Sequence, residues 1–210
     1  MAKERKISPE KQRIAANYEA QKRQFFAEGY EEKEEVISIL KANLMAFVTA
    51  GPIAILEIAV WILVGIPEKG LLSLNSASWF WVFFIASIFI HELLHGVGWS
   101  IFTKGKWKSI HIGMMWKTLT PYCHCKEPLK PREYLVGAAM PFLVLGIGLF
   151  AAALAAGSSL LFLLSIVNVL CAGGDTTLIC MLFSYLNRKD NCYILDHPTK
   201  CGFVTFSKSS

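Results

Sequence analysis

The chain has 210 residues, of which 54% are hydrophobic and 12% aromatic, with a formal net charge of +5 and a mean hydropathy of +0.43. Soluble domains are about 45–50% apolar, so this composition argues against an ordinary water-soluble domain. The positive charge does not favour a nucleic-acid partner, because basic segments beside apolar spans are attracted to anionic lipid headgroups.

Residues 1–43 form the first predicted unit, a cytoplasmic juxtamembrane segment rich in Glu, Lys, Gln and Ala. Ser8 followed by Pro9 is typical of a helix start, so we expect a charged helix over 9–42. Apolar residues recur at helical spacing from Val36 onward, which predicts an amphipathic end that lies on the membrane. A solvated charged helix without a partner is the alternative.

Four apolar blocks follow, and each is long enough to cross hydrocarbon of roughly 30 Å at about 1.5 Å per residue. We therefore predict an all-α polytopic membrane protein with four transmembrane helices. The predicted spans are approximately 44–66, 78–103, 134–157 and 159–186, which together define a membrane core over 44–186.

Two further segments lie between and after the spans. The loop 104–133 contains IHIGMMWKTLTPYCHC, in which short β-prone runs surround a Thr-Pro turn region. We expect a small cytoplasmic β-hairpin, or a partly re-entrant strand pair, between the second and third helices. The tail 187–210 is predicted to be cytoplasmic and extended.

The distribution of Lys and Arg predicts the orientation of the spans. Nine lie before the first span, seven between the second and third and four after the last, against one and none in the other two loops. Basic loops stay in the cytoplasm, so both termini and the 104–133 loop are placed there. The six cysteines then lie in the reducing compartment or within a span, which argues against a disulfide framework.

The segment FIHELLHGVGW, residues 89–99, places three ionisable side chains inside an apolar run. On a helix His91 and His95 share one face one turn apart, and Glu92 lies beside them. Each ionisable group within a span costs roughly 2–3 kcal/mol, so an unused trio is hard to maintain. We interpret the two histidines as zinc ligands and Glu92 as the base that deprotonates a water molecule.

Asp175 is the predicted third ligand. The soluble HExxHxxGxxH pattern would place a third histidine where this chain has Ile101. Asp175 is the one aspartate in any predicted span, about 17 Å from the inner end of the fourth at 1.5 Å per residue. His91 and His95 lie about 18 and 12 Å from the inner end of the second span by the same rise, so all three groups share one level.

Four other positions carry weaker predictions. Asn168 lies two turns before Asp175 and is a candidate to hydrogen-bond substrate backbone, with an ordinary interhelical bond as an equal alternative. Three neighbouring residues in the 104–133 loop could plug the open zinc position, bind a second metal or simply be reduced loop residues; they are Cys123, His124 and Cys125.

These residues give the chain a resemblance to intramembrane zinc metalloproteases of the site-2 protease group. A bacterial domain-of-unknown-function family of integral-membrane zincins is more similar, on HELLHG, the YCHCKEPL loop, Pro141 and GGD near the end. This resemblance covers about residues 75–206. The last motif departs from the site-2 protease pattern, because Cys171 stands where Pro is expected and the glycines precede Asp175.

The resemblance implies one zinc per chain, held by His91, His95 and Asp175, with Glu92 as the catalytic base. It implies an intramembrane endopeptidase of the HExxH type in the bacterial cell membrane. The partners would be a membrane-embedded peptide or protein substrate and the lipid bilayer. The alternatives are a non-proteolytic zinc-dependent hydrolase of a lipid or small amphiphile, and a metal-binding membrane scaffold.

Overall fold

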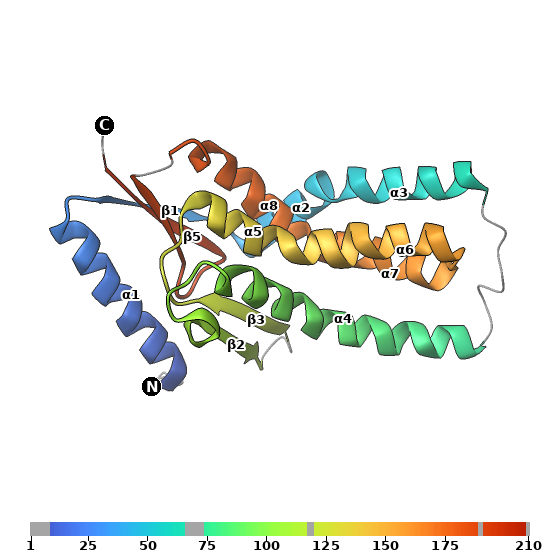
Figure 1. The fold of residues 1–210 in the computed structure, drawn as a ribbon, viewed down its shortest axis with the longest axis horizontal. Helices are drawn as coiled ribbons and strands as arrows, with labels where there is room; N and C mark the ends of the chain where they lie inside the picture. Colours follow the sequence, from blue (N-terminus) through green and yellow to red (C-terminus); the bar gives the residue numbers. More distant parts are fainter. Residues whose placement is uncertain (1–8, 66–73, 117–119, 189–190, 209–210) are drawn as a thin grey trace, which may run out of the picture.

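The computed structural model describes residues 9–65, 74–116, 120–188 and 191–208, and the chain is mostly helical (Figure 1). The first half contains α1 (Pro9–Ala27), β1 (Glu31–Val36), α2 (Ile39–Thr49), α3 (Gly51–Val64), α4 (Leu74–Ser100), the short helix η1 (Lys106–Ser109) and β2 (Ile110–Met115). The second half contains β3 (Thr120–Cys125), α5 (Pro131–Pro141), η2 (Phe142–Gly148), α6 (Leu149–Ala156), α7 (Ser159–Cys171), α8 (Gly173–Leu182), η3 (Phe183–Tyr185), β4 (Cys192–Asp196) and β5 (Gly202–Ser207).

Three helical segments are long and apolar enough to cross a membrane. They are Leu40–Val64, Ser78–Ser100 and Pro131–Ala156. A fourth apolar segment is the pair α7 and α8, which is bent by 48° at a short break. In Figure 1, α3, α4, α6 and α7 run side by side along the length of the molecule, while α1 and the larger sheet lie at the opposite end.

The larger sheet has three antiparallel strands in the order β1-β5-β4. Its central strand is buried on both faces because its side chains alternate between two apolar clusters. Val204 and Phe206 pack with Tyr18 and Phe25 of α1, whereas Phe203 packs on the opposite side with residues of α4 and α5. The sheet therefore rests directly against α5 and against α4, the helix that carries both His91 and His95.

A second sheet consists only of β2 and β3, paired antiparallel with Ile110 opposite Cys125 and Met115 opposite Thr120. Ile110 and Cys125 are both buried in the cluster that also contains Trp99 of α4. This contact fixes the end of the strand pair at which Ile110 lies opposite Cys125. As a result, β3 lies along the C-terminal half of α4.

The helices α4 and α5 approach closely because two glycines face each other. A Cβ atom on Gly98 would lie 2.6 Å from the Cα of Gly137, which is shorter than any normal contact. A Cβ on Gly137 would in turn lie 2.1 Å from Cδ1 of Trp99. Small residues at this crossing let the two backbones meet, as is common between helices in membranes.

Two predictions made from the sequence are wrong. The helix expected over 9–42 ends at Ala27, and residues 31–36 form β1 because each pairs with a residue of β5. The fold is not all-α, since β4 and β5 from the predicted tail complete this sheet. The span predicted over 159–186 coincides with α7 and α8, which are separated by a break at Ala172, and its crossing of a membrane stays a prediction.

The glycine crossing yields a first prediction. Gly98→Ala should lower the free energy of unfolding by about 1–3 kcal/mol, because an added methyl group at a packed backbone crossing forces the helices apart. Thermal unfolding in detergent measures the effect. Gly51→Ala is the matched control, since a Cβ there meets no atom within 4 Å. Equal unfolding temperatures for the two variants would contradict the close crossing.

Candidate metal centre

His91 and His95 lie on one face of α4, one helical turn apart. Their rings are close, with centroids 4.9 Å apart. Both side chains are largely shielded, with exposed fractions of 13% for His91 and 8% for His95. Polar nitrogens are therefore held inside an apolar helix, where they require partners.

Asp175 comes to the same place because the chain breaks at Ala172 and restarts as α8. It lies in the first turn of α8, where the helix dipole favours a negative charge. Gly173 allows this break to pack against α2, since a Cβ there would lie 2.3 Å from the Cβ of Ala46. Thr49 of α2 adds a hydroxyl contact of 2.7 Å to Thr176, which holds the first turn of α8 in position.

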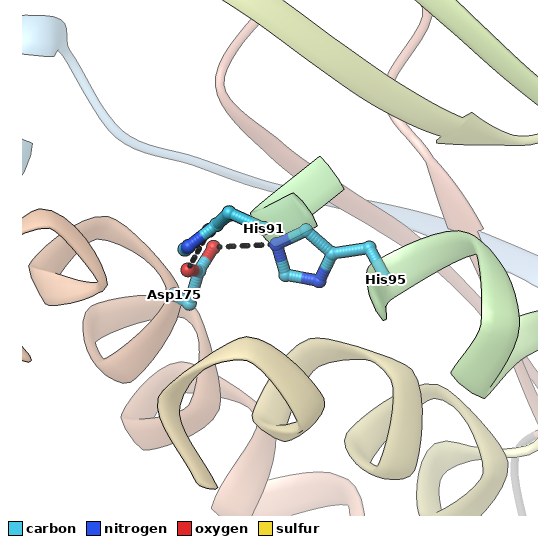
Figure 2. A group of neighbouring side chains, drawn as sticks. All are labelled: His91, His95 and Asp175. Carbon is cyan, nitrogen blue, oxygen red and sulfur yellow. Dashed lines mark ion pairs between the residues drawn. The ribbon is translucent and has the colours of Figure 1, made fainter. Parts of the chain in front are cut away.

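The two histidines converge on the two oxygens of Asp175 (Figure 2). Nε2 of His91 lies 3.0 Å from Oδ2, and Nε2 of His95 lies 3.4 Å from Oδ1. Among the residues that the structure describes, these three form the one group of His, Cys, Asp or Glu side chains whose donor atoms all lie within 4.8 Å. Zinc bonds of about 2.0–2.1 Å in a tetrahedron separate donors by about 3.3 Å, so this group fits a zinc ion.

The orientation of His95 suits metal binding through Nε2. Its Nδ1 lies 2.9 Å from the carbonyl oxygen of Gly137. Because a carbonyl only accepts hydrogen bonds, Nδ1 carries the proton and Nε2 keeps its lone pair for a metal. The ring also stacks on Trp99 at 5.2 Å, and Trp99 Nε1 donates to the carbonyl of Tyr134 at 2.9 Å.

These supporting residues leave only a partial signal in the sequence. Trp99 follows His95 by one turn and therefore shares its helix face, which is a signal that could have been used. The role of the Gly137 carbonyl cannot be predicted from the residue type, because any residue at this position would supply the same backbone oxygen. The glycine itself matters for a different reason, since it makes room for the Trp99 ring.

Glu92 lies next to His91 on α4 and near both the metal-binding group and β3. Its carboxyl group is close enough to His91, His95 and Asp175 for their charges to act on it, and it lies near the backbone of Cys123. A carboxylate beside a candidate zinc site is the arrangement that an HExxH base requires. The structure therefore brings four of the predicted site residues together.

Cys123, His124 and Cys125, predicted to lie in a loop, are the last three residues of strand β3. Their side chains alternate between the two faces of the strand. Burial raises the pKa of Cys125 to about 12 and that of Cys123 well above its ordinary value. A protonated thiol is a poor metal ligand, because the thiolate is the form that binds. His124 lies instead 3.7 Å from Asp196, so the three side chains do not converge. A plug or second metal site there stays a prediction.

Two other polar side chains within the helices have partners of their own. Asn168 is 3% exposed, and its amide donates to the Leu164 carbonyl of the same helix at 2.8 Å. Its predicted bond to substrate stays a prediction. Glu57 of α3 is also buried, and one of its oxygens lies 2.9 Å from the hydroxyl of Ser165 on α7.

An HExxH helix that meets an aspartate from a later helix is the donor set of a zincin-type metal centre. Residues 83–193 match the model of the family described as "Putative zincin peptidase", and these residues are more than half of the chain. The chain belongs to this family. The matched segment contains Glu92 and all three predicted ligands. No curated protein and no solved structure matches the chain.

Membership of a zincin peptidase family implies a zinc-dependent peptidase, and the donor set agrees with that metal. Two imidazole nitrogens and one carboxylate are a ligand set found at catalytic zinc, and they leave a fourth position open. The residues present therefore fit zinc.

Zinc content tests this site directly. Protein purified from zinc-supplemented cells should hold about one zinc per chain. His91→Ala or Asp175→Ala should reduce the zinc content to near zero, because a site with three protein ligands loses most of its zinc affinity when one ligand is removed. His124→Ala is the matched control and should retain zinc. Zinc that survives Asp175→Ala but not His124→Ala would show that β3 supplies the third ligand instead.

Proposed function

We propose that this protein is a zinc-dependent endopeptidase that hydrolyses peptide bonds of membrane-embedded substrates. The observation that carries the proposal is the position of Glu92 beside His91, His95 and Asp175, within helices whose outer surface is apolar. A scaffold needs a metal but no adjacent base. A glutamate in this position is what peptide hydrolysis requires.

The chemistry divides between the metal and the protein. Zinc, when bound, lowers the pKa of a water molecule and polarises a carbonyl. Glu92 takes the proton of the attacking water and passes it to the leaving amine, so one carboxylate acts first as base and then as acid. The Gly137 carbonyl holds the His95 ring in the tautomer that leaves Nε2 free. Asp175 supplies the negative charge that a divalent cation needs in an apolar site.

The surface of the helices supports a membrane location. Leu63 of α3 is 84% exposed, Trp81 of α4 60% and Leu143 of η2 54%. Exposing an apolar surface of this extent to water would be costly. We propose four spans, with α7 and α8 together forming the fourth as a broken helix. Broken helices are tolerated at membrane depth where they line a functional site.

We further propose that both termini and the 104–133 loop lie in the cytoplasm, on the basis of the Lys and Arg distribution. The sheet, α1 and the β2–β3 pair lie at one end of the molecule, opposite the turn between α6 and α7 (Figure 1). This arrangement supports an orientation in which the end of the molecule that contains α1 and the sheets faces the cytoplasm. The metal-binding group then lies toward the cytoplasmic side.

Cysteine labelling tests the orientation. In a background without other cysteines, Ser158→Cys in the turn after α6 should react with a membrane-impermeant maleimide on intact cells. In a second variant that keeps Cys201 as its single cysteine, this exposed residue just before β5 should react only after the cells are broken. The reverse pattern would contradict the proposed orientation, and a denatured sample controls for thiol reactivity.

The edge of β3 that faces α4 is a suitable surface for part of the substrate backbone, at the positions before Cys125, whose N–H already binds Asp196. The second sheet has only two strands, so β3 has β2 on one side and α4, with Glu92, on the other. An extended segment that adds to a strand edge gains backbone hydrogen bonds in register. A transmembrane substrate would first have to unwind, because a helical carbonyl is already hydrogen-bonded and shielded by its side chains.

Glu92→Gln separates the hydrolase from the alternatives. The variant should keep its zinc, because Glu92 is not a ligand, and should lose at least about 100-fold in kcat, as expected when a general base is removed. Release of fragments from a single-span peptide in proteoliposomes measures turnover. Wild-type turnover in the variant would contradict the proposed role of Glu92.

The choice of substrate sharpens this experiment. A peptide with a Gly-Pro pair in its span should be cleaved faster than the same peptide with Leu-Ala there, because the pair weakens the helix. A chelator should abolish both reactions, and added zinc should restore them. Cleavage of amphiphilic esters without peptide cleavage would favour the lipid hydrolase.

A further inference from the structure

Asp196 is a buried carboxylate that the proposed reaction does not use. It is the last residue of β4, lies outside the family match at 83–193, and its side chain is 11% exposed. One oxygen accepts a hydrogen bond of 2.5 Å from the Tyr134 hydroxyl, and the other accepts one of 2.7 Å from the backbone N–H of Cys125. Both bonds are within the length range of charge-assisted hydrogen bonds.

The first bond leads to His95 through α5. Tyr134 uses its hydroxyl for Asp196 and its carbonyl for Trp99 Nε1, and the rings of Tyr134 and Trp99 stack at 5.2 Å. Trp99 in turn stacks on His95. One turn after Tyr134, the Gly137 carbonyl binds Nδ1 of His95. The first turns of α5 therefore set the ring of a predicted metal ligand, and Asp196 fixes their position.

The second bond leads to Glu92 through β3. The N–H groups of Cys123 and Cys125 are two residues apart, so they point to the same edge of the strand. Cys125 donates to Asp196, and the backbone of Cys123 lies near the Glu92 carboxyl group. Asp196 and Glu92 thus lie beside neighbouring backbone groups on the same edge of β3. If β3 shifted at Cys125, the backbone of Cys123 would move with it. The surroundings of the Glu92 carboxyl group would then change.

We infer that Asp196 is a positioning residue that ties the C-terminal strand to the metal centre and sets His95 through Tyr134 and Glu92 through β3. This inference rests on the proposed zinc function. A carboxylate suits the position because the Tyr134 hydroxyl and the Cys125 N–H are donors that each need an acceptor, and Nδ1 of His124 lies 3.7 Å from the same carboxylate. Asparagine has one acceptor and one donor group, so it would set an N–H against another donor.

Zinc affinity and cobalt spectra of purified protein test the inference. Asp196→Asn and Tyr134→Phe should each weaken zinc binding about 10- to 100-fold, as is typical when a supporting partner of a metal ligand is removed. The visible absorption of the Co²⁺-substituted protein should change in both variants, because a rotated imidazole alters the ligand field. Glu34→Gln is the matched control, since this carboxylate lies in the same sheet but pairs with Lys200.

Thermal unfolding of the metal-free proteins separates positioning from loss of fold. Tyr134→Phe removes only one hydroxyl and leaves the bond of Asp196 to Cys125, so it carries the test if Asp196→Asn does not fold. The double variant should bind zinc no more weakly than Asp196→Asn alone, because that change already disturbs the connection that Tyr134→Phe breaks.

The outcomes distinguish this inference from the proposed function. Wild-type zinc affinity and an unchanged Co²⁺ spectrum in both variants, with zinc bound normally to the wild type, would overturn the role of Asp196 alone. A wild-type protein that binds no zinc through His91 would overturn the proposed function and this inference together. Weakened affinity in Glu34→Gln as well would reduce Asp196 to a general structural role, which also overturns the inference.

Discussion

The pairing of one carboxylate with two imidazoles inside apolar helices is the constraint around which the molecule is arranged. An unpaired charge at such depth is costly, so Asp175 can lie there only because His91 and His95 approach it at 3.0 and 3.4 Å. This requirement explains why α7 stops at Ala172 and α8 restarts beside α2, since the new helix start favours the negative charge. It also explains the glycines, because Gly173 and Gly137 let the neighbouring helices approach closely enough.

The same centre is supported from the opposite end of the molecule. The three-stranded sheet packs Phe203 into the cluster that contains Trp99 and Tyr134, so the sheet lies beneath the turn of α4 that carries His95. The β2–β3 pair closes another side and brings the Cys123 backbone to Glu92. A rigid support of this kind matters for catalysis, because small displacements of positioned groups reduce rates strongly. The sheet is therefore more than a cover for the polar end of the helices.

The sequence predicts those parts of the fold and site that local patterns encode. Hydropathy marks the apolar helices, and helical spacing places His91, His95 and Glu92 on adjacent positions of one helix. Asp175 was found because it is the one aspartate in any predicted span. Strand β1 was missed because EEKEEV has the residue types of a charged helix, and it becomes a strand only through pairing with β5, far along the chain. The contribution of the Gly137 carbonyl was missed because it is a backbone atom, and that of Asp196 because it depends on contacts across many residues of chain.

The central claim is that zinc is held by nitrogen and oxygen donors of His91, His95 and Asp175. X-ray absorption at the zinc edge of the purified wild-type protein measures this ligand set directly. We expect the zinc to have only nitrogen and oxygen ligands, at about 2.0–2.1 Å, with imidazole scattering from two histidines. A sulfur neighbour at about 2.3 Å would contradict it, because Cys123 or Cys125 would then bind the metal in place of the proposed set.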